Sequence, residues 1–430
     1  MGTVPTNTIA SRTPKRILLP AYLLLPACLL LVAACTASAQ TLARPGWNGS
    51  GFNADPWWKH AIFYQLDPQP AKEIVGKLDA LQSLGIDALL LPAQDATASD
   101  SEAFDELIRQ ASRRNLRVLL TLQASSANAD LAATARLWLS RGASGFRVVT
   151  PPGQDNQAIV QALRKLTSSA VGGRIVIADF NASASPVAAP PHLLSRDSRA
   201  KNSASIGDPV VAQLQSAQLQ IDSRMSSIQP PDAAALRPLL AQSLLQPNLL
   251  LDFTPTAAPP NAPVSALARV IATIQLTTHP AALIGADPQL ALQPEPPAPD
   301  ATAAKPLATP QPAAAPTATL ADWVRQLDAL HRGNATLRYG SIALLNFDAQ
   351  NVLVWVSRPA PGAGLAAPVV VVCNLSSSPA KLSLTAAIKS LGLHGWFLRT
   401  LLRSDQAMGA QDLDSVAVPP FGVYIGELHR

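Results

Sequence analysis

The sequence predicts an α/β fold with parallel strands, followed by a smaller antiparallel β region. Apolar residues at helical spacing alternate along the chain with compact β-branched runs, and the clearest step is Trp138–Pro151. There an apolar helix end stops at Gly142, and the run Phe146–Val149 follows. A helix that leads directly into a short buried strand is typical of parallel α/β folds. After Ser341 the pattern changes to short alternating runs separated by turn signals, which favours an antiparallel sandwich.

The composition allows a large core and excludes several classes of function. Of the 430 residues 48% are hydrophobic and 14% are charged, with a formal net charge of +5. No basic cluster stands together with aromatic residues, so we expect no nucleic-acid partner. Cys28, Cys35 and Cys373 do not form a disulfide framework, and the six scattered histidines lack the spacing of a zinc site. We therefore expect no metal and no other cofactor.

The N-terminal segment 1–39 has the pattern of an export signal. Basic residues up to Arg16 precede the uncharged apolar run Ile17–Ala34, and Ala37–Ala39 is a small-residue cleavage pattern. Val32–Ala34 followed by Cys35 resembles a bacterial lipobox, which implies lipidation of Cys35 and a periplasmic, membrane-tethered protein. Cleavage after Ala39 would instead leave a free secreted chain, and an uncleaved membrane anchor is a third alternative.

The remaining elements follow from the period of the apolar residues. In the helix Lys72–Leu84, for example, Ile74, Leu78 and Leu81 recur at helical spacing. A sixth strand cannot be placed in Ser183–Pro231, where the periodicity is low. The predicted helices are 72–84, 101–114, one from 130, 156–170, 233–244, 264–277 and 320–332, and the predicted strands are one within 55–66, then 88–91, 117–122, 146–149, 174–179, 248–253, 351–356, 369–373, 381–384 and 422–426.

Four motifs resemble the α-amylase superfamily, glycoside hydrolase family 13. WLSRGASGFRVVTP resembles W-L-x-x-G-x-D-G-F-R-x-D of the family's fourth strand, and DPWWKHAIFYQL resembles its opening W-W-K-x-A-x-x-Y-Q. GIDALLLPA and THPAALIGAD resemble its second and eighth strands. The resemblance implies a (β/α)8 TIM barrel over residues 55–335, with a Pro/Ala-rich loop at 293–319, and a C-terminal β-sandwich over 337–430. The segment after the third strand is too short for the family's usual inserted domain, and the resemblance implies that Trp57 and Trp58 plug the barrel floor more readily than they bind sugar.

The catalytic residues of the family are mostly replaced. Val149 stands where the family has its nucleophilic Asp, and Phe253-Thr254-Pro255 stands where it has Asn-His-Asp. Thr121, Ser125 and Ser126 replace polar substrate-binding residues, and Asp179 stands in the place of the acid Glu. A retaining glycosidase needs two carboxyl groups about 5–5.5 Å apart, one of them a nucleophile. Valine cannot form the covalent intermediate.

Arg147 and Asp179 are the remaining candidate site residues. In the family, an arginine at the position of Arg147 holds the nucleophile ionised, and here Asp179 is the obvious new counter-ion. Asp179 could be a structural partner of Arg147, a ligand for sugar hydroxyls together with Arg147, or a remnant catalytic acid. Asp67, Asp95, Asp252 and Asp287 also fall near strand ends, and a rebuilt catalytic pair of Asp179 with Asp252 is an alternative.

These observations favour an exported, catalytically inactive amylase-like protein. It would bind an α-glucan or another carbohydrate, or a protein partner at the cell envelope. The compact architecture is also similar to the amylase-like ectodomain of amino-acid transporter heavy chains, which implies a partner protein instead of an enzyme. The alternative is an active glycoside hydrolase or transglycosidase on α-glucans, with a non-standard carboxylate pair that includes Asp179.

Overall fold

The computed structural model describes residues 1–2, 55–92, 101–123, 131–151, 157–179, 217–246, 248–259, 261–285, 290, 319–345, 350–362 and 366–430. The predicted leader with Cys35 and nearly all of the predicted 293–319 loop lie outside these ranges, as do Asp95, Ser125, Ser126 and Asp287. Residues 55–430 form one compact unit. In the described part of the chain, no helix is long and apolar enough to cross a membrane.

The first part of this unit is the predicted barrel, an eight-stranded parallel sheet ordered β7-β6-β5-β4-β3-β2-β1-β8. β7 and β8 lie next to each other, although no ladder pairs them within the described residues, so the barrel is nearly closed. Its strands are β1 (Ile62–Gln65), β2 (Ala88–Leu91), β3 (Arg117–Gln123), β4 (Gly145–Val149), β5 (Ile175–Asp179), β6 (Leu219–Asp222), β7 (Leu249–Leu251) and β8 (Ala282–Ile284).

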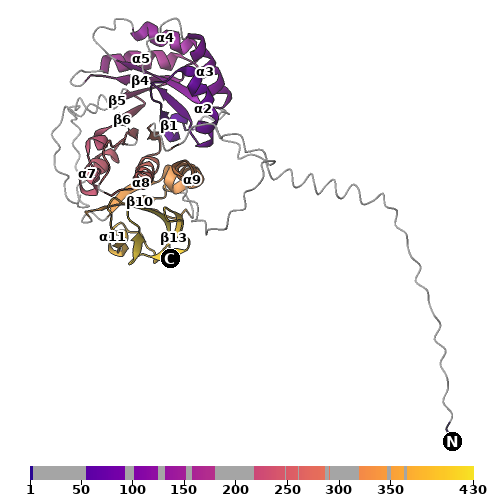
Figure 1. Ribbon diagram of the computed structural model, residues 1–430, viewed down its shortest axis with the longest axis vertical. Coiled ribbons are helices and arrows are strands. Elements are labelled where there is room, and N and C mark those ends of the chain that lie inside the picture. Colours follow the sequence, from indigo (N-terminus) through magenta and orange to yellow (C-terminus); the bar gives the residue numbers. More distant parts are fainter. Residues whose placement is uncertain are drawn as a thin grey trace, which may run out of the picture. The chain divides into compact units, whose positions relative to one another are not determined.

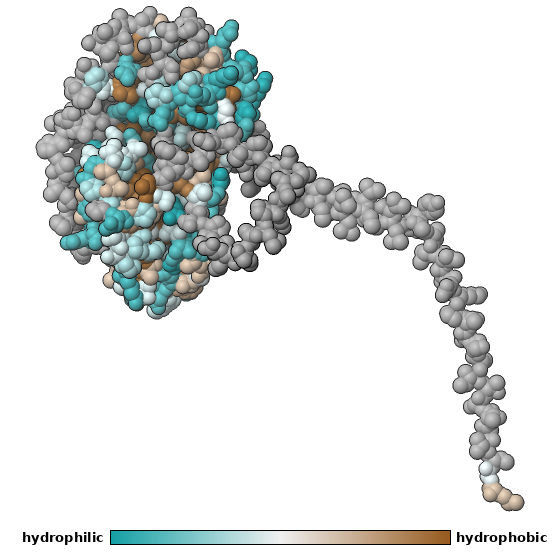
Figure 2. Space-filling view, viewed as in Figure 1, coloured by the Kyte–Doolittle hydropathy of each residue, from teal (hydrophilic) through white to brown (hydrophobic). Residues whose placement is uncertain are grey.

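The helices that follow these strands surround the sheet (Figure 1). On the face shown in Figure 2, the outer surface over α2 and α3 is mostly hydrophilic, whereas their inner residues belong to the core. The helices are α2 (Ala71–Ser83), α3 (Ser101–Arg113), α4 (Leu131–Ser140), α5 (Gln157–Ser169), α7 (Ala233–Ser243), α8 (Val264–Thr277), α9 (Leu320–Gly333) and α10 (Ala335–Tyr339), with 3-10 turns η3 (Trp57–His60) and η6 (Arg224–Ser227).

Strand alternation separates the barrel residues into two layers. Phe63, Leu90, Ile177 and Leu250 belong to a lumen cluster, whereas their chain neighbours pack outward against the helices. The sixth strand, which the sequence left unplaced, alternates in the same way, with Leu219 and Ile221 in the lumen. Its outward residues Gln220 and Asp222 are polar, so it lacks the continuous apolar run that identified its neighbours.

The predicted C-terminal antiparallel region is present. Six strands are ordered β14-β13-β16-β11-β10-β9, and β12 pairs with β15 in a second sheet. The bounds are β9 (Ser341–Leu345), β10 (Val352–Arg358), β11 (Val369–Asn374), β12 (Ala380–Leu382), α11 (Thr385–Ser390), β13 (Phe397–Arg403), β14 (Ala410–Asp412), β15 (Val416–Val418) and β16 (Val423–His429).

The barrel and the sandwich share one apolar core. The cluster that lines the barrel helices also contains Trp355 of β10 and Val371 of β11, both fully buried. Arg237 of α7 crosses this interface and donates a hydrogen bond from Nη2 to the carbonyl of Val352 over 2.8 Å. The sandwich therefore completes the burial of the barrel helices that face it.

Candidate functional site

The carboxyl ends of strands β4 and β5 bring three candidate residues, Arg147, Val149 and Asp179, to one mouth. On β4, Phe146 and Val148 pack outward, so Arg147 and Val149 lie on the lumen face. On β5 the lumen residue Ile177 is followed two positions later by Asp179, and the register pairs Arg147 with Ile177. The mouth of a parallel barrel is where its polar chemistry gathers.

Arg147 and Asp179 form the contact that the sequence suggested. Arg147 Nε donates to Asp179 Oδ1 over 2.9 Å, and Nη2 donates to Oδ2 over 3.2 Å. The free edge of the guanidinium donates from Nη1 to Gln65 Oε1 at the end of β1, over 2.7 Å. The side chains of Arg147 and Asp179 are only 12% and 24% exposed, so the bidentate pair is largely withdrawn from solvent.

Two opposing effects act on the Asp179 carboxyl. Burial raises its pKa, because a desolvated carboxylate is costly, and the hydrogen bonds and charge of Arg147 lower it. The negative charge of Asp252 adds to the rise, which leaves the pKa of Asp179 above its ordinary value. The charge of Asp252 therefore lies near enough to Asp179 to affect its protonation.

Val149 occupies the mouth beside this pair. It follows Arg147 on the same face of β4, and its backbone pairs with Gln123 of β3. Thr121, on the lumen face of β3, is half-buried and pairs with Arg147. No carboxylate, hydroxyl or thiol stands at the Val149 position, so this part of β4 supplies no nucleophile.

The loops after β6 and β7 hold Asp252 at the same mouth. Ser226 Oγ donates to the Asp252 carbonyl over 2.9 Å and accepts from the Thr254 N–H over 2.8 Å. Thr254 Oγ1 donates to Asp252 Oδ1 over 2.6 Å. Leu250, two residues before Asp252, faces the lumen, so alternation directs Asp252 to the mouth.

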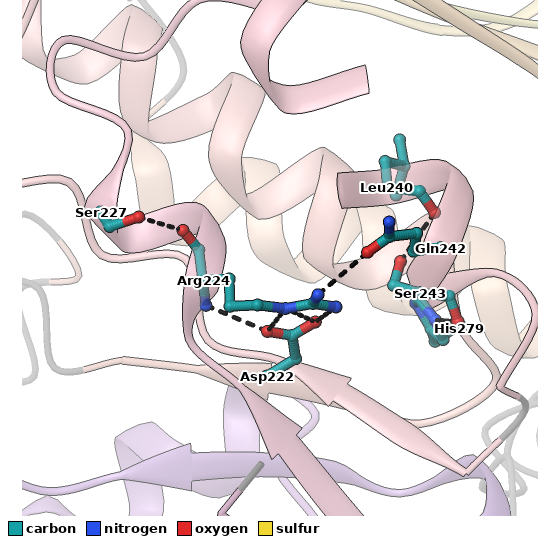
Figure 3. Close-up of polar contacts among 7 residues, drawn as sticks. All are labelled: Asp222, Arg224, Ser227, Leu240, Gln242, Ser243 and His279. Carbon is teal, nitrogen blue, oxygen red and sulfur yellow. Dashed lines mark hydrogen bonds and ion pairs between the residues drawn. The ribbon is translucent and has the colours of Figure 1, made fainter. Parts of the chain in front are cut away.

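An ion pair that the sequence did not suggest anchors the loop carrying Ser226 (Figure 3). Asp222 faces outward from β6 toward α7 and is 1% exposed. Arg224 Nε donates to Asp222 Oδ1 over 2.9 Å, and Arg224 Nη2 donates to Asp222 Oδ2 over 2.6 Å. Arg224 Nη1 also donates to Gln242 Oε1 on α7 over 3.0 Å. The Asp-x-Arg spacing at the end of a strand was the only local signal for this anchor.

The other candidates do not join the mouth cluster. Asp67 is exposed beyond the end of β1, and Pro255 follows Thr254 without a polar side chain. Trp57 and Trp58 pack against the lumen cluster at the opposite, amino-terminal end, in agreement with a floor plug. The described ranges contain no cluster of His, Cys, Asp or Glu side chains that could hold a metal ion.

Comparisons with known proteins place the fold. No protein-family model matches the sequence, and no curated protein matches it. Among solved structures, the chain is similar to an isomaltulose synthase from Klebsiella sp. LX3, with a TM-score of 0.62 and 14% identity over 88% of this chain and 100% of that chain. It is also similar to a trehalulose synthase mutant in complex with Tris, with a TM-score of 0.61 and 13% identity over 87% and 100% of the two chains. A further match is another mutant of this trehalulose synthase, MutB, in complex with the substrate sucrose. Its TM-score is 0.61 and its identity 14%, over 87% of this chain and 100% of that chain. At this identity the likeness shows a shared fold: a TIM-like barrel with antiparallel sheets in the C-terminal region.

Proposed function

We propose that the chain is a catalytically inactive amylase-like protein that binds a carbohydrate at the mouth of its barrel. The observation that carries the proposal is the bidentate pair of Arg147 and Asp179 beside Val149. The carboxylate that could act as an acid is engaged by a cation, and the position of the nucleophile is apolar. Loss of one member of a catalytic set that acts as a unit removes most of the rate.

The remaining polar groups of the mouth suit a sugar. Gln65, Arg147 and Asp179 offer amide, guanidinium and carboxylate groups on rigid strand ends, and Asp252 and Thr254 add acceptors and a hydroxyl. Such planar polar groups bind vicinal hydroxyls by paired hydrogen bonds. The similar structures named above include enzymes that form isomaltulose and trehalulose, which supports a saccharide as the ligand. An α-glucan or a related oligosaccharide is the ligand that we propose.

Calorimetric titration with sucrose, isomaltulose and maltooligosaccharides tests this proposal. The wild type should bind at least one of them and release no reducing sugar or isomer above background. Gln65→Ala removes an acceptor from Arg147 and a contact of the mouth, and should weaken binding about tenfold, the value of one charge-assisted hydrogen bond. Lys165→Gln, an exposed change on α5, should bind as the wild type does. Failure to bind any of the sugars, or binding that Gln65→Ala leaves unchanged, would count against a mouth site.

A second candidate function is hydrolysis or transglycosylation by Asp179 together with Asp252. The observation that favours it is electrostatic: burial and, as a smaller effect, the charge of Asp252 raise the pKa of Asp179, as a general acid requires. If the wild type turns over a sugar and each of the single variants Asp179→Asn and Asp252→Asn does not, this activity is established and the proposal of a catalytically inactive protein is wrong.

We also propose that the protein is exported and acts at the cell envelope. The support is the leader pattern, with its basic start, apolar run and Cys35. A protein partner there is the alternative to a sugar ligand, by analogy of architecture with the transporter heavy chains. Analogy of fold alone does not transfer that role.

A further inference from the structure

Two loops meet at the mouth of the barrel, and one serine side chain joins them. Ser226 lies in η6, after β6, whereas Asp252 and Thr254 follow β7. Ser226 Oγ donates to the Asp252 carbonyl over 2.9 Å and accepts from the Thr254 N–H over 2.8 Å. A hydroxyl can donate one hydrogen bond and accept another at the same time, which a methyl group cannot do. Ser226 therefore fixes the backbone on both sides of Phe253.

The Asp252 side chain is held by the same set of contacts. Thr254 Oγ1 donates to Asp252 Oδ1 over 2.6 Å, so the carboxylate is oriented by the residue whose N–H bonds to Ser226. The Asp252 N–H donates to the carbonyl of Asp222 over 3.0 Å. The methyl group of Thr254 packs against Gly285 after β8, where an added Cβ atom would lie 3.0 Å from Thr254 Cγ2. Loss of the Ser226 hydroxyl would thus loosen both Thr254 and the carboxylate that it orients.

Ser226 itself is held firmly, because its turn is fixed on two sides. The preceding residue, Met225, is 1% exposed and belongs to the apolar core. Arg224 binds the carboxylate of Asp222 and donates to Gln242 on α7, outside the barrel. A side chain orients its partner well only when its own position is supported in this way. The ion pair outside the barrel is thereby connected to the mouth.

A second link joins the same two loops farther from Asp252. Gln229 Nε2 donates to the Ser226 carbonyl over 2.7 Å, and Gln229 Oε1 accepts from the Ala257 N–H over 2.6 Å. In the described part of the chain, Gln229 has no hydrogen bond to Asp252 or Thr254. It therefore keeps the loops together when the Ser226 hydroxyl is removed, and we expect Ser226→Ala to fold.

We propose that Ser226 is a positioning residue of the mouth, which fixes the Asp252 carboxylate and the Thr254 hydroxyl where they meet a ligand. The consequence for ligand affinity rests on the sugar site proposed above, whereas the effect on Asp252 does not. The competing explanation is that Ser226 only stabilises the loop. It predicts a change in stability without a change in the electrostatics of the mouth.

Asp179 reports the position of Asp252 without any sugar. Burial raises the pKa of Asp179, Arg147 lowers it, and the charge of Asp252 adds to the rise as a smaller effect. The strand registers pair Asp179 with Ile221, and Ile221 with Leu250. Asp252 follows Leu250 by two residues on the same strand face. If Asp252 moved toward solvent, its charge would be screened more strongly and would raise the pKa of Asp179 less.

A pH titration of the Asp179 carboxyl by carbon-13 NMR of the full chain tests the proposal. In Asp252→Asn the pKa of Asp179 should fall, because a nearby negative charge is removed, and Ser226→Ala should lower it part of the way. Ser226→Thr keeps the hydroxyl and should keep the wild-type pKa of Asp179. Ser227→Ala is the matched control and should also keep it, because Ser227 Oγ donates to the Arg224 carbonyl within the same turn, over 2.6 Å (Figure 3).

Calorimetric titration with sucrose and maltooligosaccharides measures the consequence for the ligand. Ser226→Ala should weaken binding about fivefold, the value of one neutral hydrogen bond, whereas Ser227→Ala should bind as the wild type does. A pKa of Asp179 that is equal in wild type and Ser226→Ala, or that Asp252→Asn leaves unchanged, would overturn the positioning role. If the wild type binds no sugar, the sugar site is wrong, and the titration of Asp179 still decides the role of Ser226.

Discussion

At the scale of single residues, the mouth of the barrel shows how a largely buried cation is paired. Arg147 lies beside Val149, which offers no charge, and its partners are Asp179 on the adjacent strand and Gln65 on β1. A buried cation without a counter-ion would be strongly destabilising. The pair therefore maintains the folded barrel whether or not a ligand occupies the mouth.

Removal of Arg147 should expose this dependence. Arg147→Ala leaves Asp179 desolvated without its cation, and we expect a loss of about 3 kcal/mol in the free energy of unfolding, the lower end of the range for a broken buried pair, because Asp179 stays partly exposed. The loss should become smaller as the pH is lowered from 8 to 5, because without Arg147 nothing offsets the rise that burial causes in the pKa of Asp179, and protonation removes the unpaired charge. Urea unfolding at the two pH values measures both. A combined Arg147→Met and Asp179→Leu variant should recover much of the loss, and a single variant as stable as wild type would show that the pair contributes nothing.

His331 makes the stability sensitive to acid. It is 4% exposed on α9, its Nε2 has no partner among the described residues, and burial lowers its pKa to about 3. Because the unfolded chain has the ordinary value near 6.5, the unfolded state binds more protons between pH 6.5 and pH 3. The stability that neutral His331 provides is complete above pH 6.5 and is lost as the pH falls toward 3, at up to about 1.4 kcal/mol per pH unit.

The variant His331→Leu tests this pH dependence. Between pH 7 and pH 4.5, its free energy of unfolding should fall less steeply than that of the wild type. His394→Gln, a change at an exposed histidine, should keep the wild-type slope. Equal slopes for wild type and His331→Leu would assign the acid sensitivity to other groups.

At the scale of elements, β4 and β5 approach each other closely at a glycine. A Cβ atom built on Gly145 would lie 2.2 Å from the backbone oxygen of Ile175, with which Gly145 pairs. The clash would be with a backbone atom of β5, which cannot rotate out of the way as the end of a side chain can. Gly145 thus sets the register that places Arg147 beside β5 and Asp179.

Gly145→Ala should therefore destabilise the protein by about 3 kcal/mol or more, the cost of overpacking where nothing can relax. Gly76→Ala is the matched control, because Gly76 lies in the middle of α2 with nothing within 4 Å of its added Cβ. That change should stabilise the protein by roughly 0.5–1 kcal/mol through helix propensity. Thermal unfolding of both variants distinguishes the two effects, and a neutral Gly145→Ala would contradict the close approach.

At the scale of the whole molecule, the shared core makes the barrel depend on the sandwich. Trp355 and Val371 of the sandwich belong to the apolar cluster that lines the barrel helices, and Arg237 bonds across the interface to Val352. A polar group that crosses such an interface stays satisfied only while both parts are in place. The two parts are therefore expected to unfold together.

The leader proposed above would decide where this molecule works. Cys35 follows Val32–Ala34, and we propose that Thr36–Asn53, which is rich in small and polar residues, is a tether that follows the lipidated cysteine. Expressed in a bacterium, the protein should fractionate with membranes, because two acyl chains give stable attachment where one does not. Cys35→Ser should release the protein or leave it unprocessed, whereas Cys28→Ser, inside the same apolar run, should not. Mass spectrometry that finds a soluble mature chain beginning at Gln40 would exclude the tether.

The sequence by itself determined most of the barrel elements and their order, and it put an apolar residue, Val149, at the end of the fourth strand. Apolar spacing is a local property, so helices such as Val264–Thr277 and strands such as Ala88–Leu91 were predicted with the bounds that the structure has. The identity of Val149 needed no structure either. The strand Leu219–Asp222 was not predicted, because its outward residues are polar and it has no continuous apolar run.

Only the tertiary structure decided which side chains meet. Gln65 and Asp179 converge on Arg147 from three strands, Ser226 holds Asp252 through a loop anchored by Arg224, and Trp57 joins Arg117 to the turn before Arg174. Strand alternation assigns each residue to the lumen or to the helices, but it does not set the stagger between strands. That stagger comes from closing all the strands around one core, a property of the whole chain that no local pattern contains.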